Sequence, residues 1–359
     1  MKLIRFTFLV MSICLVSSCS SNDDSSDDQD PQNENLYFPP LNSDTWETKS
    51  ITELNWNENQ LLPLLDFLEE KNSKSFMILH EGKIVVEKYF NDHSNTTPWY
   101  WASAGKTLTT AITGIAQDQD LINIEDKVSD YLGAGWTSAP LDKENLITVK
   151  NLLSMNSGLD DTLGDNVLPS NLQYISDAGE RWAYHNVYVK LQDVISQASG
   201  NTWVNYFNSE LKNKVGMSGS WINLNNFNVY WSNTRSMARF GLLNYANGKW
   251  ETEQIIPETY LNDATNTSQF INKAYGYLWW LNGKSNYHLP QSQVQFPGEL
   301  VPNAPSDMFA ALGKNDQKIY VVPSKKIVVI RMGESAEDEN FALSNFDNAL
   351  WEKINASIN

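Results

Sequence analysis

Apolar positions near the start of the chain predict a helix followed by a β-hairpin. Leucines recur at helical spacing within residues 59–72, and two β-rich runs follow at 76–80 and 83–90. Glu81 and Gly82 separate the two runs. A two-residue connection that contains glycine is typical of a hairpin, because glycine readily adopts the left-handed conformations that such turns need.

The end of the chain has the same two kinds of element in the opposite order. Residues 318–322 and 327–332 are β-rich and flank a short polar connection. A closing helix follows, in which Phe346, Leu350 and Ile354 form one apolar stripe. Strands near both ends indicate a sheet to which both ends of the domain contribute.

The middle of the chain is mainly helical in its pattern. Segments of helical character lie at 107–118, 150–155, 187–198, 203–213 and 237–246. The simplest architecture is an α+β fold, with an antiparallel sheet flanked by the terminal helices plus a mainly helical subdomain. The sheet subdomain would comprise about 46–102 and 300–359, and the helical subdomain about 103–299. We expect the functional site at their junction, where pockets tend to form.

The first 18 residues have the layout of a secretion signal. A basic start is followed by an apolar run at 6–16, which is too short to span a bilayer, and by small residues that lead to Cys19. The segment resembles a bacterial lipoprotein signal, with cleavage before Cys19 and lipidation of its sulfur. An ordinary secretory signal, in which Cys19 is incidental, is the alternative.

Residues 19–45 are expected to form an acidic, disordered tether, because carboxylates crowd a Ser/Asn/Gln-rich stretch with almost no apolar residues. Such tails resemble the surface-export signals of Bacteroidetes lipoproteins. We therefore expect a lipid anchor in the outer membrane, compatible with exposure at the cell surface, and a folded domain at 46–359. The formal net charge of -17 argues against a nucleic-acid partner, since phosphate binding needs a basic face.

Cysteine and histidine usage excludes several kinds of site. The only cysteine besides Cys19 is Cys14, inside the predicted signal, so the mature protein has no intramolecular disulfide and no catalytic cysteine. The four histidines form no metal-like cluster, so we expect no metal site. A Ser-His-Asp triad stays open, although no Gly-x-Ser-x-Gly motif occurs.

Ser103 and Lys106, three residues apart, are the candidate nucleophile and its base. At helical spacing their side chains share one face. At a first helical turn, free backbone N–H groups and the helix dipole favour negative charge on the serine oxygen. A dry site with other cations nearby would lower the lysine pKa and provide a neutral amine. The chain also has this spacing at Ser209 and Lys212, and a capping serine with a solvated lysine is the structural alternative.

Tyr184 is the candidate for a second acid or base. It lies in a polar turn ahead of an apolar helix, from which a tyrosine can project into a cleft. Asn186, two residues further on, would bond a substrate amide or the lysine. The Tyr-x-Asn pattern occurs elsewhere in this chain, and a tyrosine that packs a loop is the alternative.

Together these motifs resemble the serine hydrolases of the β-lactamase superfamily, in its class C-like branch. That branch includes penicillin-binding carboxypeptidases, esterases and aminohexanoate-dimer hydrolases. The Ser-x-x-Lys and Tyr-x-Asn motifs match the first two catalytic motifs in order, and residues 147–159 are similar to the signature T-x-x-x-L-L-x-x-x-S-G-L. The resemblance covers about residues 75–335 and implies a β-lactamase-like fold.

The third catalytic motif of that family, Lys-Thr/Ser-Gly or His-x-Gly on a strand beside the site, is matched least well. Its counterpart here is Lys314-Asn315-Asp316. The resemblance implies that Lys314 helps to lower the pKa of Lys106 and binds a substrate carboxylate or carbonyl. Asp316 stands where the pattern has glycine, so we expect its side chain to narrow the site and its carboxylate to repel anionic substrates.

The mechanism that the resemblance implies is acyl transfer without a metal or organic cofactor. Ser103 attacks an ester or amide carbonyl while Lys106 and Tyr184 move its proton. The backbone N–H groups of Ser103 and Gln317 would hold the oxyanion. Some tryptophans would either line an apolar cleft or pack in the core: Trp99, Trp101, Trp182, Trp279 and Trp280.

The sequence is compatible with three functions. The first is a lipid-anchored hydrolase of small esters, amides or peptides. The same residues would also serve a β-lactamase or a penicillin-binding D-Ala-D-Ala carboxypeptidase. A surface lipoprotein that binds a ligand without catalysis is the alternative from another class, although it would have no use for Ser103, Lys106 and Tyr184 together. The natural substrate and the oligomeric state are left open.

Overall fold

The computed structural model describes residues 36–224, 227–337 and 343–358. The predicted signal, Cys19 and the first part of the predicted tether lie outside the described residues. Within these ranges, no helix is long and apolar enough to cross a membrane.

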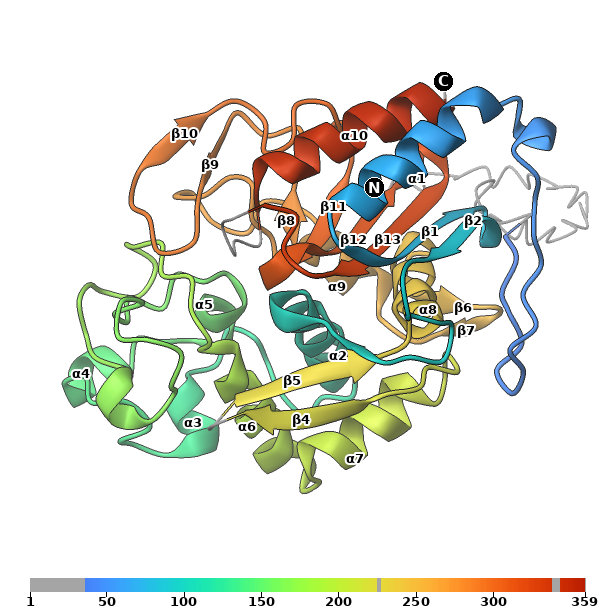
Figure 1. The fold of residues 1–359 in the computed structure, drawn as a ribbon. Helices are drawn as coiled ribbons and strands as arrows, with labels where there is room; N and C mark the ends of the chain where they lie inside the picture. Colours follow the sequence, from blue (N-terminus) through green and yellow to red (C-terminus); the bar gives the residue numbers. More distant parts are fainter. Residues whose placement is uncertain (1–35, 225–226, 338–342, 359) are drawn as a thin grey trace, which may run out of the picture. The chain divides into compact units, whose positions relative to one another are not determined.

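A six-stranded antiparallel sheet, in the order β2-β1-β13-β12-β11-β8, lies at the centre of the described chain (Figure 1). Its strands are β1 (Ser73–His80), β2 (Lys83–Tyr89), β8 (Trp280–Leu281), β11 (Phe309–Gly313), β12 (Gln317–Val322) and β13 (Ile327–Gly333). Both predicted hairpins are confirmed, and β1 pairs with β13, so the two ends of the domain share one sheet. The sequence pattern does not predict β8 or β11.

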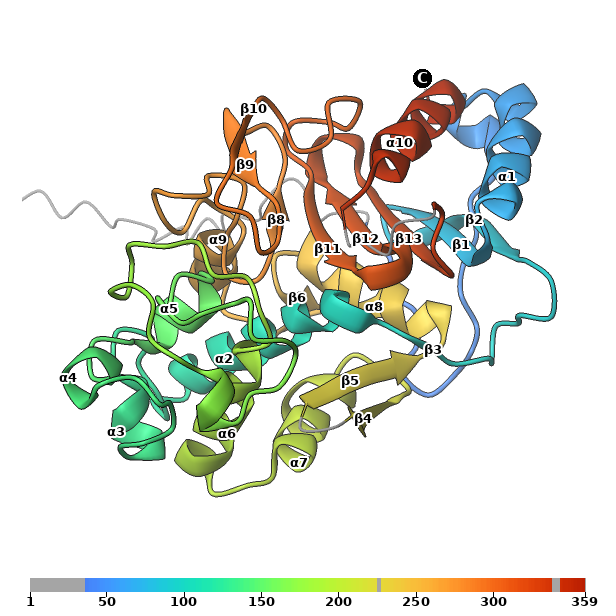
Figure 2. The same ribbon diagram turned by 60° about the vertical axis from the view of Figure 1, so that its left-hand side comes forward.

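Helices cover both faces of this sheet (Figure 2). On one face α1 (Leu61–Glu70) and α10 (Asn345–Ile358) lie side by side, and the rings of Phe67 and Phe346 stack with centroids 5.8 Å apart. On the other face α8 (Thr234–Tyr245) packs against β12 and β13. A Cβ at Gly241 would lie 2.5 Å from Cγ1 of Val328, so glycine permits this close approach. The assignment of this helix to the helical subdomain is therefore wrong.

The turn that carries Ser103 lies among the remaining elements, which make up the rest of the domain. Its helices are α2 (Lys106–Asp118), α3 (Val128–Leu132), α4 (Leu141–Glu144), α5 (Val149–Leu153), α6 (Tyr188–Ser199), α7 (Trp203–Phe207) and α9 (Glu258–Ala264). Its strands are β3 (Trp99–Tyr100), β4 (Ser220–Leu224), β5 (Phe227–Ser232), β6 (Lys249–Trp250), β7 (Glu253–Gln254), β9 (Asn286–His288) and β10 (Gln295–Pro297). The first eleven residues of α2 are buried, which makes it the central helix of this part.

The packed domain begins earlier than residue 46. Leu36, Tyr37 and Phe38 pack against the hydrophobic core. The buried guanidinium of Arg239 donates hydrogen bonds to the backbone oxygens of Pro39 and Pro40 at 3.3 and 2.7 Å. Residues 36–45, which the sequence assigns to the tether, thus form part of the domain, because their apolar side chains and carbonyl groups find partners there.

The connection between β11 and β12 has an unusual backbone. Asn315 and Asp316 both adopt left-handed conformations, with φ of 59° and 60°. Such a conformation costs a residue other than glycine about 1–2 kcal/mol. Arg331, which is fully buried, donates hydrogen bonds of 3.0 Å to the backbone oxygens of both residues. These bonds help to offset the conformational cost and hold the turn in place.

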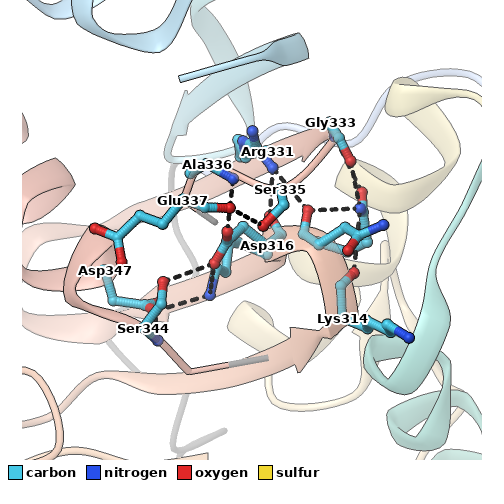
Figure 3. A network of polar contacts seen from close by, with 12 residues as sticks. Lys314, Asp316, Arg331, Gly333, Ser335, Ala336, Glu337, Ser344 and Asp347 are labelled. Atoms are coloured by element: carbon cyan, nitrogen blue, oxygen red, sulfur yellow. Dashed lines mark hydrogen bonds and ion pairs between the residues drawn. The ribbon is translucent and has the colours of Figure 1, made fainter. Parts of the chain in front are cut away.

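The carboxylate of Asp316 lies at the centre of a buried polar network (Figure 3). It forms an ion pair with Lys318 at 3.1 Å and accepts hydrogen bonds from the Ser344 hydroxyl at 2.9 Å and the Ala336 backbone N–H at 3.0 Å. Lys318 also contacts Asp347 at 2.8 Å. The network links the β11–β12 turn to β12, α10 and the chain beyond β13. Figure 3 shows the side chain of Lys314 pointing away from it.

Removing the charge of Asp316 tests this network. In Asp316→Asn the buried Lys318 loses the charged partner that lies 3.1 Å away, so we expect the free energy of unfolding to fall by about 3 kcal/mol. The matched control is Glu125→Gln, which removes an ion pair of 2.6 Å between Lys150 and Glu125, whose side chains are 36% and 61% exposed. That change should cost less than about 1 kcal/mol. Equal losses in urea unfolding would contradict the network's structural role.

Candidate active site

Ser103 lies on a single 3-10 turn, Ala102–Gly105, that runs directly into α2. The residue before it, Ala102, has a left-handed φ of 48°, a conformation that non-glycine residues rarely adopt and that clusters at functional sites. The preceding Trp101 is fully buried, and its indole N–H donates a hydrogen bond of 2.8 Å to the Ser232 hydroxyl. A strained residue on a rigid support thus presents the serine at the start of a buried helix.

Lys106 occupies the position that the motif predicts for a base. Its Nζ lies 2.8 Å from the Ser103 Oγ and 3.5 Å from the Asn186 Oδ1. The rings of Tyr184 and Tyr188 flank it, with centroids 4.9 and 4.7 Å from Nζ. Only 2% of Lys106 is exposed. The structure therefore brings the predicted nucleophile and base into hydrogen-bond contact.

Burial lowers the pKa of Lys106 to about 7, against the opposing charge of Asp165. About half of the amine is then neutral at pH 7 and able to accept a proton. Removal of Lys106 from water is the cause of the shift, and the expected contribution of Lys314 is not among its causes.

Tyr184 is buried beside the same serine. Burial raises its pKa to about 12, while hydrogen bonding with Ser103 and Trp280 opposes the shift. Its ring packs against Trp182 and Trp280, with centroids 5.8 and 5.6 Å apart. At neutral pH the phenol is therefore protonated, and it suits the donation or relay of a proton better than its removal.

Asn186 holds the loop beside the site. Its side-chain N–H donates to the Asp165 backbone oxygen at 3.1 Å, while its Oδ1 faces Lys106. Asp165, which the sequence analysis does not single out, is thereby placed near the amine. No local pattern marks this aspartate, because a long loop brings it to the site.

A cavity of about 380 Å³ opens at Ser103. The residues that line it are Tyr100, Ala102, Ser103, Lys106, Asp165, Asn186, Tyr188, Leu224, Phe227, Val229, Trp231 and Lys314. Lys314 is exposed, and its ammonium makes no ion pair or hydrogen bond within the described residues. No histidine is among the described lining residues, and burial lowers the pKa of His185 to about 3, so a histidine base has no support here.

One expectation for the third motif is corrected by this geometry. Asp316 is fully buried in the network described above, so its carboxylate neither narrows the cavity nor repels a ligand. The side chain of Gln317 is also fully buried and donates a bond of 2.6 Å to the Gly333 backbone oxygen. The role expected of Gln317 rests on its backbone N–H and stays a prediction. The motif predicts the position of this turn but not which way its side chains point.

Gly313 brings the end of β11 against the serine turn. A Cβ at this position would lie 2.4 Å from the Trp101 backbone oxygen and 3.0 Å from the Ala104 nitrogen. Only glycine permits that approach. The backbone at Gly313 therefore lies against the residues on either side of Ser103, and Lys314, which follows it, lines the same cavity as the serine.

The predicted tryptophans belong mainly to the core. Trp101, Trp182, Trp279 and Trp280 are at most 1% exposed, and Trp99 is half-buried. The aromatic residues that do line the cavity include Tyr100 and Trp231. These cavity residues were not predicted from the sequence. The signal that could have identified them is the alternation of Phe227, Val229 and Trp231 along one strand. Within the described residues, no group of three or more His, Cys, Asp or Glu side chains could hold a metal ion.

Comparison with known proteins agrees with this fold. The family model described as Beta-lactamase matches residues 68–350. A solved structure from Bacillus anthracis assigned as a 6-aminohexanoate-dimer hydrolase has a TM-score of 0.66 and 17% identity, over 90% of this chain and 88% of that one. One from Bacteroides dorei DSM 17855 assigned as a beta-lactamase has a TM-score of 0.66 and 15% identity, over 88% and 99%.

A third structure, EstCE1, a hydrolase with promiscuous acyltransferase activity, has a TM-score of 0.63 and 13% identity, over 86% of this chain and 99% of that one. Comparison with curated protein sequences finds no match. At these identities the solved structures show the fold alone, whereas the family model covers most of the chain. The chain therefore belongs to the Beta-lactamase family.

Proposed function

We propose that the protein is a serine hydrolase that cleaves small esters or amides through an acyl-enzyme on Ser103. The observation that carries the proposal is the 2.8 Å contact between the Ser103 Oγ and the Nζ of a buried Lys106 whose pKa is about 7. A serine hydroxyl becomes a useful nucleophile when a neutral base at that distance can take its proton.

The first half of the reaction forms the acyl-enzyme. Lys106 takes the proton of Ser103 as Oγ attacks the carbonyl carbon. The resulting oxyanion is held by the Ser103 backbone N–H, at the positive end of α2, and by backbone N–H of the segment at Gly313 and Lys314. When the tetrahedral intermediate collapses, the bond to the alcohol or amine breaks and the proton passes to that leaving group, with Tyr184 as the relay.

The second half returns the enzyme to its starting state. Water attacks the acyl carbon, its proton goes to the Lys106 amine, and the bond to Oγ breaks as Ser103 is reprotonated. The free acid and the resting enzyme are the products. No step calls on a cofactor, since Lys106, Tyr184 and the backbone supply the proton transfers and the charge stabilisation.

A second candidate activity is β-lactam hydrolysis or D-Ala-D-Ala carboxypeptidase action. Its support is the ammonium of Lys314, which is exposed at the cavity without an acidic partner among the described residues and could pair with a substrate carboxylate. The burial of Asp316 removes the repulsion that would have opposed such substrates. A ligand-binding protein without catalysis is less compatible with a buried amine held against a serine.

We also propose that the mature protein is anchored through a lipid on Cys19 in the outer membrane. The support is the sequence of residues 1–34, with its short apolar run and acidic tail. Mass spectrometry of the membrane fraction would detect the modified N-terminal peptide, and release of the Cys19→Ser protein into the soluble fraction would agree with it.

Covalent labelling tests the nucleophile. We expect a fluorophosphonate to label the wild-type domain and not Ser103→Ala, because only an activated serine reacts. Ser209→Ala is the matched control, since it removes the second serine of this spacing, whose hydroxyl instead donates to the Tyr206 backbone oxygen at 3.1 Å. Labelling by a fluorescent penicillin as well would favour the second candidate. Labelling that survives in Ser103→Ala would overturn the assignment.

The pH dependence of ester hydrolysis tests the base. Because the neutral form of Lys106 is required and its pKa is about 7, kcat/KM should fall about tenfold per pH unit well below 7 and level off above it. Tyr184, with a pKa of about 12, adds no second fall below pH 10. A rate at pH 5.5 equal to that at pH 8.5 would rule out this role for the lysine, provided circular dichroism shows a folded protein at both values.

A further inference from the structure

One wall of the Ser103 cavity is the face of a strand pair, β4 and β5. Side chains alternate between the two faces of a strand. On β5, Phe227, Val229 and Trp231 all border the cavity, whereas Tyr230 points the other way and packs edge-on against Trp101 at 5.3 Å. Leu224 of β4 lies directly opposite Phe227 and borders the cavity too. One face of the pair thus belongs to the core and the other to the cavity.

The polar atoms on this side of the cavity are already engaged or covered. The Tyr188 hydroxyl donates to the Asn228 backbone oxygen at 3.0 Å, and the Tyr100 hydroxyl accepts a hydrogen bond from the Asn315 side chain. The indole N–H of Trp231 is buried beneath the surface. What this wall offers to a ligand is therefore ring faces and hydrocarbon.

Part of this hydrocarbon is not covered by the described residues. Leu224 is 43% exposed although it borders the cavity. A ligand that covered the leucine would remove apolar surface from water, which is favourable in proportion to the area buried. The polar lining residues, which include Ser103, Lys106 and Lys314, lie elsewhere around the cavity.

We propose that the β4–β5 face is an acyl-chain site, and that the protein acts on esters or amides whose acyl group is an unbranched hydrocarbon of several carbons. This inference rests on the proposed function. The chain lies against Leu224, Phe227 and Val229 while its carbonyl carbon reaches Ser103. The bond to the serine oxygen forms and the bond to the leaving alcohol or amine breaks, with the serine proton moving to the leaving group through Lys106 and Tyr184. Hydrolysis then releases the fatty acid.

A series of 4-nitrophenyl esters tests the site, because a constant leaving group leaves only the acyl chain to vary. From acetate to butyrate to hexanoate, kcat/KM should rise about fourfold per buried methylene. In Leu224→Asn the ratio of hexanoate to acetate should drop about tenfold, with the acetate rate little changed. Acetate and hexanoate turned over equally well by the wild type would overturn the inference.

The matched control is Asn223→Ala. Asn223 precedes Leu224 on the same strand but points to the opposite face, where its side chain donates a hydrogen bond of 3.2 Å to the Asn228 Oδ1, and it does not border the cavity. Its substitution should leave the hexanoate-to-acetate ratio within about twofold of the wild-type value. If it lowers the ratio as much as Leu224→Asn does, the effect comes from weakening the strand pair and the acyl site is contradicted.

Failure of the proposed function looks different from failure of this inference. If Ser103→Ala hydrolyses every ester as fast as the wild type, the nucleophile is wrong. In that case the acyl-chain site is tested by ligand binding alone. Calorimetric titration of Ser103→Ala measures the affinity for octanamide and for acetamide. Tighter binding of octanamide, lost in the Leu224→Asn background, supports an apolar chain site. Equal binding of the two amides overturns it.

Discussion

The site depends on one constraint, which is the removal of the Lys106 amine from water. Each unit of pKa shift corresponds to about 1.4 kcal/mol, so a shift from 10.5 to about 7 makes the charged form about 5 kcal/mol less favourable than in water. Cation–π attraction to the flanking rings of Tyr184 and Tyr188 opposes this shift by about 2 kcal/mol for each ring. The cost of desolvation therefore exceeds the cation–π attraction, and an amine that is normally charged is available as a neutral base.

The rest of the fold serves that constraint. The buried helix α2 carries the lysine, and Trp101 fixes the strained turn before it. On the other side, the buried network around Asp316 and Arg331 holds the β11–β12 turn against the serine. These two supports come from distant parts of the sequence. They meet at Gly313, where the absence of a side chain lets the backbones touch.

Much of this arrangement was predictable from sequence, and the failures have physical causes. Apolar periodicity located both hairpins and most helices, while spacing and order identified Ser103, Lys106 and Tyr184. The direction in which a single side chain points could not be predicted from the sequence, because it depends on partners that are distant along the chain. Asp316 points into the interior because its carboxylate forms an ion pair with Lys318 and accepts a hydrogen bond from Ser344 there. The β4–β5 face was not predicted from the sequence because these strands are short and lie between segments of helical character.

The role of Lys106 as the base is tested most directly by the pKa of its amine. NMR titration of the folded domain with isotope-labelled lysine side chains, with the signal assigned by its loss in Lys106→Met, reports the protonation of this amine without relying on any substrate. We predict a midpoint close to 7 for this amine, well separated from those of the surface lysines. A midpoint above 10 would show that the amine stays charged at neutral pH, and it would contradict the role of Lys106 as the base.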